Sequence, residues 1–85
     1  MTPFSTFNTT FYKQDEYDIW DAIKGWSSYH FICIMKDNTI QRFIGSLDEN
    51  YIGEISQHLD CITSDDYDSY DINYWCEIDK TLLGF

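Results

Sequence analysis

The chain has 85 residues, with fifteen Asp or Glu against five Lys or Arg, and a formal net charge of −10 at pH 7. Its length predicts a single domain, residues 1–85, and a chain this short buries only about 60 to 65% of its unfolded surface. Three Trp, seven Tyr and six Phe must therefore supply a dense core. Direct binding to DNA, RNA or an anionic membrane is disfavoured, because those ligands require Lys and Arg.

Targeting signals and cysteine spacing indicate the cellular compartment of the protein and the kinds of site to expect. Residues 1–12 lack the positive n-region and apolar h-region of a signal peptide, and no apolar run reaches the length of a membrane span. We therefore expect a cytoplasmic protein, located in the host cell cytoplasm if a phage encodes it. Cys33, Cys61 and Cys76 are odd in number and lack C-x-x-C spacing, so we expect buried reduced thiols and no cofactor or metal.

The pattern of residues 2–24 predicts an extended arm followed by a helix. Residues 2–12 mix Phe with Thr and Ser, which suits an aromatic arm that packs on the body of the protein. A helix is predicted over residues 13–24, because Ile19, Trp20 and Ile23 fall on one stripe and Gly25 stands at the expected C-terminal cap.

Residues 29–36 and 39–44 are predicted to form a β-hairpin. Both runs are rich in β-branched and aromatic residues, and Asp37-Asn38 between them suits a two-residue turn. This loop length places Cys33 opposite Arg42 and Phe31 opposite Ile44.

A second helix is predicted over residues 47–61. Ser46-Leu47-Asp48-Glu49 fits a capping box, in which the Ser and Glu side chains satisfy backbone N–H groups at the helix start. The apolar residues that follow are spaced by three and four, as on one face of a helix: Ile52, Ile55, Leu59 and Ile62.

Residues 71–79 alternate as a strand does. Ile72, Tyr74, Cys76 and Ile78 would share one face, which leaves Asn73, Trp75, Glu77 and Asp79 on a solvated face. The predicted fold class is α+β, in the order helix-strand-strand-helix-strand. Two helices would pack on a three-stranded antiparallel sheet of strand order 2-1-3.

The distribution of charge indicates a candidate binding surface. Residues 43–79 contain ten carboxylates and no Lys or Arg, and such a one-signed surface attracts a basic partner. Carboxylates at regular intervals can substitute for phosphates, and Tyr and Trp among them are suited to dominate an interface. The predicted partner-binding residues are Asp65, Asp66, Tyr67, Asp68, Tyr70, Asp71, Trp75, Glu77 and Asp79.

Three alternatives concern the same residues. The loop could be a solvated acidic segment whose aromatic residues fold onto the core. Asp66, Asp68 and Glu77 match positions 1, 3 and 12 of a calcium-binding EF-hand loop, but Asp71 replaces the required Gly at position 6. Enzymatic activity is not expected, because two loop carboxylates in water lack the unlike environments of a catalytic pair, and His30 and His58 fit no triad spacing.

Three functional hypotheses follow. The first is an inhibitor that occupies the nucleic-acid-binding surface of a basic protein, a DNA mimic of the kind that phages use against restriction or CRISPR systems. The second is an immunity protein or antitoxin that neutralises a basic nuclease toxin, whose association the acidic charge would accelerate. The third is an acidic adaptor subunit in which the charge serves mainly solubility.

Overall fold

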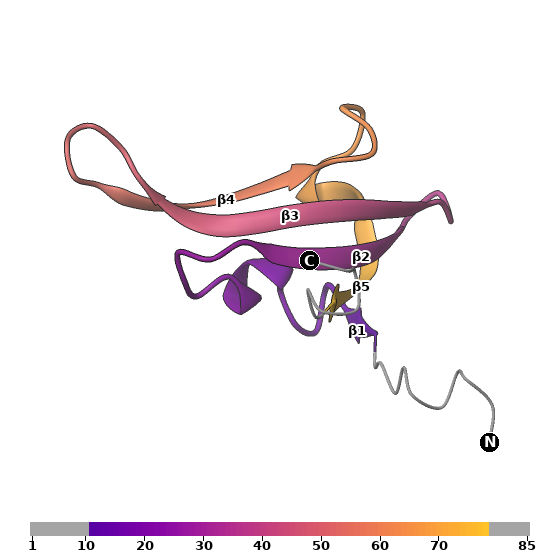
Figure 1. The fold of residues 1–85 in the computed structure, drawn as a ribbon. Coiled ribbons are helices and arrows are strands. Elements are labelled where there is room, and N and C mark those ends of the chain that lie inside the picture. The colour runs from indigo at the N-terminus through magenta and orange to yellow at the C-terminus, as the bar shows by residue number, and fades with distance from the viewer. Residues whose placement is uncertain (1–10, 79–85) are drawn as a thin grey trace, which may run out of the picture.

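The computed structural model describes residues 11–78, which form one antiparallel sheet of five strands (Figure 1). The strand order is β1-β5-β2-β3-β4. The helical elements within these residues are two short 3-10 helices, so the predicted α+β class is wrong. The elements are β1 (Tyr12–Lys13), η2 (Ile19–Ala22), β2 (Tyr29–Met35), β3 (Ile40–Glu49), β4 (Ile55–Cys61), η3 (Ser69–Asp71) and β5 (Ile72–Ile78).

Part of the predicted sheet is present within this larger one. Strand β2 lies between β3 and β5 and pairs antiparallel with both, as the predicted order of those three strands requires. Two further strands, β1 and β4, extend the sheet at its edges. Most of the predicted N-terminal arm lies outside the described residues.

The predicted helix over residues 47–61 is wrong, because a tight turn interrupts it. The Asn50 N–H donates to the Glu54 carbonyl over 2.9 Å, and the Gly53 N–H donates to the Asn50 carbonyl over 3.0 Å. Gly53 has a φ of 83°, a conformation that suits glycine at the end of a three-residue hairpin loop. The Ser46–Glu49 segment, predicted as a capping box, instead lies in β3, with Ser46 opposite His58 of β4.

The predicted helix over residues 13–24 is reduced to the four residues of η2. Asp18 is the N-cap of η2, because its side chain accepts a hydrogen bond of 3.1 Å from the Trp20 N–H. The helical turn therefore begins after Asp18 and not at residue 13. Short polar side chains of this kind compete with the helical backbone for its N–H groups. Ile19 and Ile23 are still buried, so the apolar stripe covers the sheet without a full helix.

The β2–β3 hairpin has a loop one residue longer than predicted. The Met35 N–H donates to the Thr39 carbonyl over 2.8 Å, and Asn38 adopts a φ of 70°. This shift places Phe31 opposite Phe43, where Ile44 was predicted, and Cys33 opposite Gln41, where Arg42 was predicted. A shift of one residue moves a strand's side chains to the other face, so Phe43 joins the core beside Phe31.

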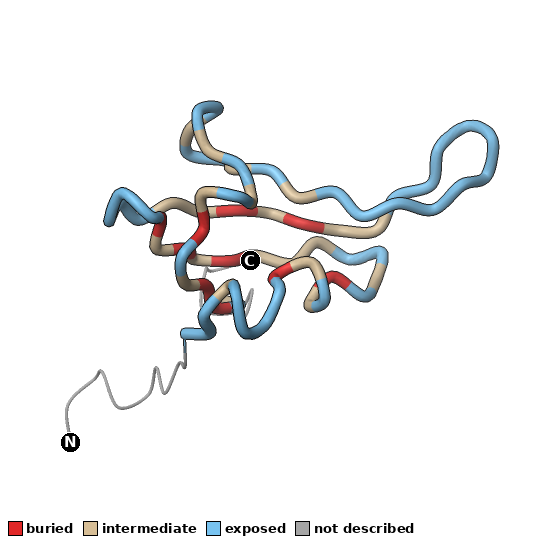
Figure 2. Tube along the Cα trace, turned by 180° about the vertical axis from the view of Figure 1, so that it is seen from behind, coloured by how far each residue is buried: buried red, intermediate tan, exposed pale blue. Residues whose placement is uncertain are grey.

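The core lies between one face of the sheet and the segment that contains η2 (Figure 2). On β5 the pairing shifts near its start, since Met35 pairs with Ile72 and Ile34 with Tyr74, which leaves Asn73 as an extra residue. This bulge reverses the alternation and turns Trp75 inward, and its side chain is 2% exposed. The predicted solvated face of β5 is therefore wrong for Trp75. The buried core cluster comprises Ile19, Ile23, Phe31, Cys33, Met35, Phe43, Ile72 and Trp75.

Helices that could cross a membrane are absent from residues 11–78, where neither helical element has the necessary length or apolar character.

Candidate functional site

The fold divides the long acidic segment between two ends of the sheet. Asp48, Glu49 and Glu54 lie at the β3–β4 hairpin, which extends beyond the other strands in both overall views (Figures 1 and 2). The loop of residues 62–71 follows β4 at the opposite end, since Cys61 pairs with Phe43 near the start of β3. We call residues 62–71 the acidic loop; its carboxylates are those of Asp65, Asp66, Asp68 and Asp71.

Tyr67 attaches the acidic loop to the β2–β3 turn. Its phenol donates a hydrogen bond of 2.5 Å to Oδ2 of Asp37, whose Oδ1 accepts a bond of 2.6 Å from the Thr39 hydroxyl. The bonds from Thr39 and Tyr67 hold the pKa of Asp37 below its usual value, and the Asp37 carboxylate raises the pKa of Tyr67. Tyr67 is half-buried and packs against the core, so it serves chiefly as an anchor.

A second attachment lies at the start of the loop. The Thr63 hydroxyl donates to Oε1 of Gln41 over 2.6 Å and accepts from the Arg42 N–H over 3.3 Å. Both anchors connect the loop to the same end of the β2–β3 hairpin, so the loop is held at two points.

Within the loop, two carboxylates stabilise a single helical turn. Asp68 caps η3 and accepts a hydrogen bond of 2.9 Å from the Tyr70 N–H, while Asp71 accepts one of 3.0 Å from the Asp68 N–H. These reciprocal bonds form a capping box. Asp65 and Asp66 are exposed, and no Lys or Arg among residues 11–78 forms an ion pair with any of the four loop carboxylates.

An open cleft of about 640 Å³ lies beside η3. Tyr70, 83% exposed, forms part of one wall, and Asp15, Asp18 and Trp20 from the segment around η2 form part of another. Aromatic faces and carboxylates together suit a cationic side chain, because a guanidinium can stack on the ring and pair with the acid. The complete lining consists of Gln14, Asp15, Asp18, Trp20, Lys36, Ser69, Tyr70, Ile72 and Asn73.

Sequence reasoning did not assign Asp15, Asp18 and Trp20 to the site. They lie outside the segment that lacks positive charge, among the residues predicted to form a helix over 13–24. The pairing of β1 with β5 brings them near the acidic loop, because it places Lys13 opposite Tyr74. The concentration of acids before Trp20 was the available signal.

Two further predicted site residues, Trp75 and Glu77, lie in β5 and outside the acidic loop. Trp75 lies in the core, where its indole N–H donates to the Tyr17 carbonyl over 2.8 Å and its ring meets Phe31 edge-on. Its side chain therefore offers almost no surface to a partner. Glu77 is exposed on β5, opposite Phe31 of β2, and Asp79 lies outside the described residues.

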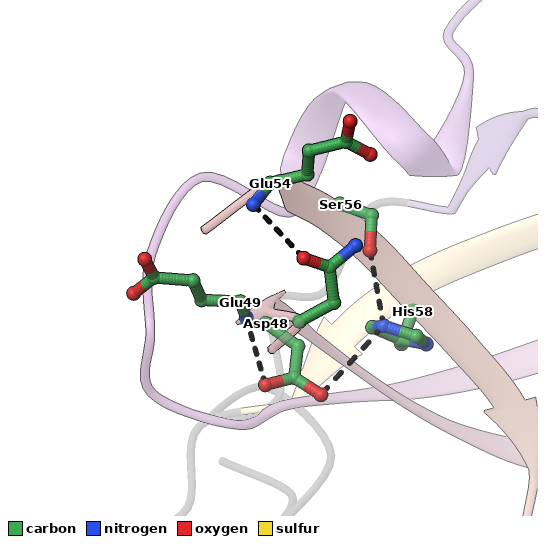
Figure 3. Close-up of polar contacts among 6 residues, drawn as sticks. Asp48, Glu49, Glu54, Ser56 and His58 are labelled. Atoms are coloured by element: carbon green, nitrogen blue, oxygen red, sulfur yellow. Dashed lines mark hydrogen bonds and ion pairs between the residues drawn. The ribbon is translucent and has the colours of Figure 1, made fainter. Parts of the chain in front are cut away.

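A serine, a histidine and an aspartate meet on the β3–β4 hairpin (Figure 3). The Ser56 hydroxyl lies 3.2 Å from Nε2 of His58, and Oδ2 of Asp48 lies 3.7 Å from the same nitrogen. In a catalytic triad the serine and the carboxylate contact opposite nitrogens of the imidazole, so that one orients the ring while the other loses a proton. This cluster lacks that arrangement.

Metal-binding geometry is also lacking in the described part of the chain, where no group of three or more His, Cys, Asp or Glu side chains is placed to hold an ion. Glu77, the last ligand position of the EF-hand alternative, lies in β5, whereas the motif requires a helix there.

Comparison of the chain with protein-family models, with curated proteins and with solved structures gave no match.

Proposed function

We propose that this chain is a small acidic inhibitor that binds a basic, nucleic-acid-binding protein and occupies the surface on which that protein holds DNA or RNA. The partner would be a nuclease or a nuclease complex, and the interaction would take place in the cytoplasm. The chain would act by mimicry of a nucleic acid and would carry no catalytic activity of its own.

The observation that carries this proposal is the acidic loop. Four carboxylates, none of which forms an ion pair with a Lys or Arg among residues 11–78, occur within seven residues, from Asp65 to Asp71, on a loop that Tyr67 and Thr63 attach to the sheet. A groove lined with Lys and Arg binds phosphates because they form a dense row of fixed negative charge. A held acidic loop can offer such a groove a similar pattern, whereas a flexible one would lose conformational entropy on binding.

The cleft beside the loop adds a means of specificity. Charge alone would attract any basic protein, but a cleft with Trp20 and Tyr70 near Asp15 and Asp18 can accept one cationic side chain in a defined position. Lys36 also lines this cleft. The cleft would therefore favour a ligand that leaves the Lys36 ammonium group exposed to water. Binding by this surface would block the partner's own nucleic acid.

A capture and competition experiment tests the proposal. The immobilised chain would be incubated with lysate of its natural host, and bound protein would be eluted either with duplex DNA or with polyglutamate of equal total charge. We expect DNA to release a nucleic-acid-binding protein at a lower concentration than polyglutamate does. A ternary complex of chain, partner and DNA would contradict mimicry, and if the partner were a nuclease toxin, it would support the immunity hypothesis.

A further inference from the structure

Among residues 11–78, the edge of the sheet along β4 has no neighbouring strand. Strand β4 pairs with β3 on one side, and no described segment pairs with its other side (Figure 1). The bonds from Asn50 to Glu54 and from Ile62 to Arg42 show that even-numbered residues of β4 face β3. The N–H and C=O groups of Ile55, Gln57, Leu59 and Cys61 therefore point away from the sheet.

This edge lacks the features by which proteins usually protect an exposed strand. Edge strands are commonly short, bulged, or furnished with Lys or Pro, which prevent pairing with another chain. Strand β4 has seven residues, pairs with β3 without a register shift, and contains one carboxylate, Asp60, but no Lys, Arg or Pro. Ile55 at its start is 59% exposed, and Figure 2 shows most of the hairpin in the colour of exposed residues.

We infer that the edge of β4 accepts an extended segment of the basic partner as a sixth strand of the sheet. This inference rests on the proposed function, which supplies the charge of the partner. Residues 43–61 contain four carboxylates and no Lys or Arg, so a basic strand complements the hairpin. A second copy of this chain would instead place one net charge of −10 beside another.

The two faces of the hairpin define which side chains the added strand carries. Ile55 and Leu59 lie on the face that holds the core, whereas Ser56, His58 and Asp60 lie on the other face with Asp48. Neighbouring strands place side chains of the same face next to each other. The occupant therefore alternates apolar residues beside Ile55 and Leu59 with Lys or Arg beside Asp60 and beside Ser56, which lies opposite Asp48 of β3.

A peptide titration followed by amide hydrogen exchange tests this inference. The probe is an acetylated, amidated octapeptide of alternating Lys and Val, and the control is a peptide of the same composition with four Lys followed by four Val. On addition of the alternating peptide, we expect the amides of Ile55, Gln57, Leu59 and Cys61 to gain protection. The amides of Ser56, His58 and Asp60 already face β3 and should not change.

Two further controls separate strand addition from charge attraction. N-methylation of alternate peptide residues on the bonding edge removes the donors and should abolish the protection. Ile55→Pro and Ile55→Ala both remove the exposed side chain, but only the proline removes an outward N–H, so only Ile55→Pro should reduce the protection. If Ile55→Pro unfolds the hairpin, the N-methylated peptide still decides the matter.

The following outcomes would overturn the inference. Binding of the block peptide with equal protection would show charge attraction alone, and so would binding of the alternating peptide without protection of these four amides. Protection that rises with protein concentration in the absence of peptide would make the occupant a second copy of the chain. Capture of a DNA-displaceable partner that leaves these amides unprotected would overturn strand addition and leave the proposed function intact.

Discussion

The phenol of Tyr67 donates a hydrogen bond of 2.5 Å to the carboxylate of Asp37, which lies 30 residues earlier in the chain. This bond joins the acidic loop to the β2–β3 turn, because Asp37 is also bound by the hydroxyl and the backbone N–H of Thr39. One carboxylate thus orders its own turn and holds the loop that carries the candidate site.

Asp37 should make the stability of the fold depend on acid pH. Its hydrogen bonds to Thr39 and Tyr67 lower its pKa in the folded state. The stability that the ionised Asp37 carboxylate contributes is therefore complete above its unfolded-state pKa of about 3.9. This stability is lost as the pH falls through the lower pKa of Asp37 in the folded state. We expect Asp37→Asn to be less stable than wild type at pH 7, by a margin that shrinks below about pH 4.

Urea denaturation of both proteins across that pH range, followed by circular dichroism, would measure the margin. A difference between the two midpoints that stayed constant from pH 7 to pH 2 would show that the ionised carboxylate does not contribute.

The two hairpin turns should respond differently to substitution. Gly53 has a φ of 83°, and an Ala there must adopt a left-handed conformation that costs about 1 to 2 kcal/mol. Asn38 has a φ of 70°, which Gly adopts without steric cost, so Asn38→Gly should change stability much less. Chemical denaturation of Gly53→Ala and Asn38→Gly would compare them, and equal effects would mean that the β3–β4 turn is wrong.

The two aromatic residues Trp75 and Tyr70 should contribute in opposite ways. Trp75 is 2% exposed, so Trp75→Ala should destabilise the fold by about 3 to 5 kcal/mol or prevent folding. Tyr70 is 83% exposed, and Tyr70→Ala should alter stability by no more than about 0.5 kcal/mol. Thermal denaturation of the pair distinguishes the observed bulge in β5 from strict alternation, which would place Trp75 in solvent.

The three free cysteines should differ in reactivity. Burial raises the pKa of the Cys33 thiol to about 12 and also raises the pKa of Cys76, whereas Cys61 is only half-buried. The thiolate is the reactive form, so iodoacetamide should modify Cys61 first in the folded protein and all three after denaturation. Peptide mass spectrometry over a time course would identify the order, and early modification of Cys33 would contradict the core described above.

The residue pattern predicted a strand correctly where the same residues did not also fit a helix. Residues 29–35 are β-branched or aromatic in four of seven positions and form the central strand. Residues 55–61 fit two periods, because Ile55 and Leu59 are four apart as in a helix and also lie on alternate positions of a strand. The turn at Asn50 and Gly53 decided between them, since Gly is unfavourable inside a helix and well suited to a hairpin loop.

Long-range relationships could not be obtained from local pattern. The bulge at Asn73 depends on how β5 aligns with β2, and it reverses the face on which Trp75 lies. Likewise, the count of charges indicated the acidic loop, but only the pairing of β1 with β5 brings Asp15 and Asp18 to the cleft beside Tyr70. The charge of the sequence therefore indicated the acidic-loop part of the candidate site. The part formed by Asp15 and Asp18 depends on the pairing of β1 with β5 and could not be predicted from charge.

The most direct measurement compares two pairs of neutralising substitutions that change the net charge equally at opposite ends of the sheet. Asp65→Asn with Asp66→Asn alters the acidic loop, and Glu49→Gln with Glu54→Gln alters the β3–β4 hairpin. Affinity for the DNA-displaceable partner would be measured by calorimetry at fixed salt. We predict that the acidic-loop pair weakens binding about tenfold more than the hairpin pair, a difference of about 1.4 kcal/mol. Equal losses from the two pairs, or a larger loss from the hairpin pair, would contradict the assignment of the acidic loop as the nucleic-acid-mimicking surface.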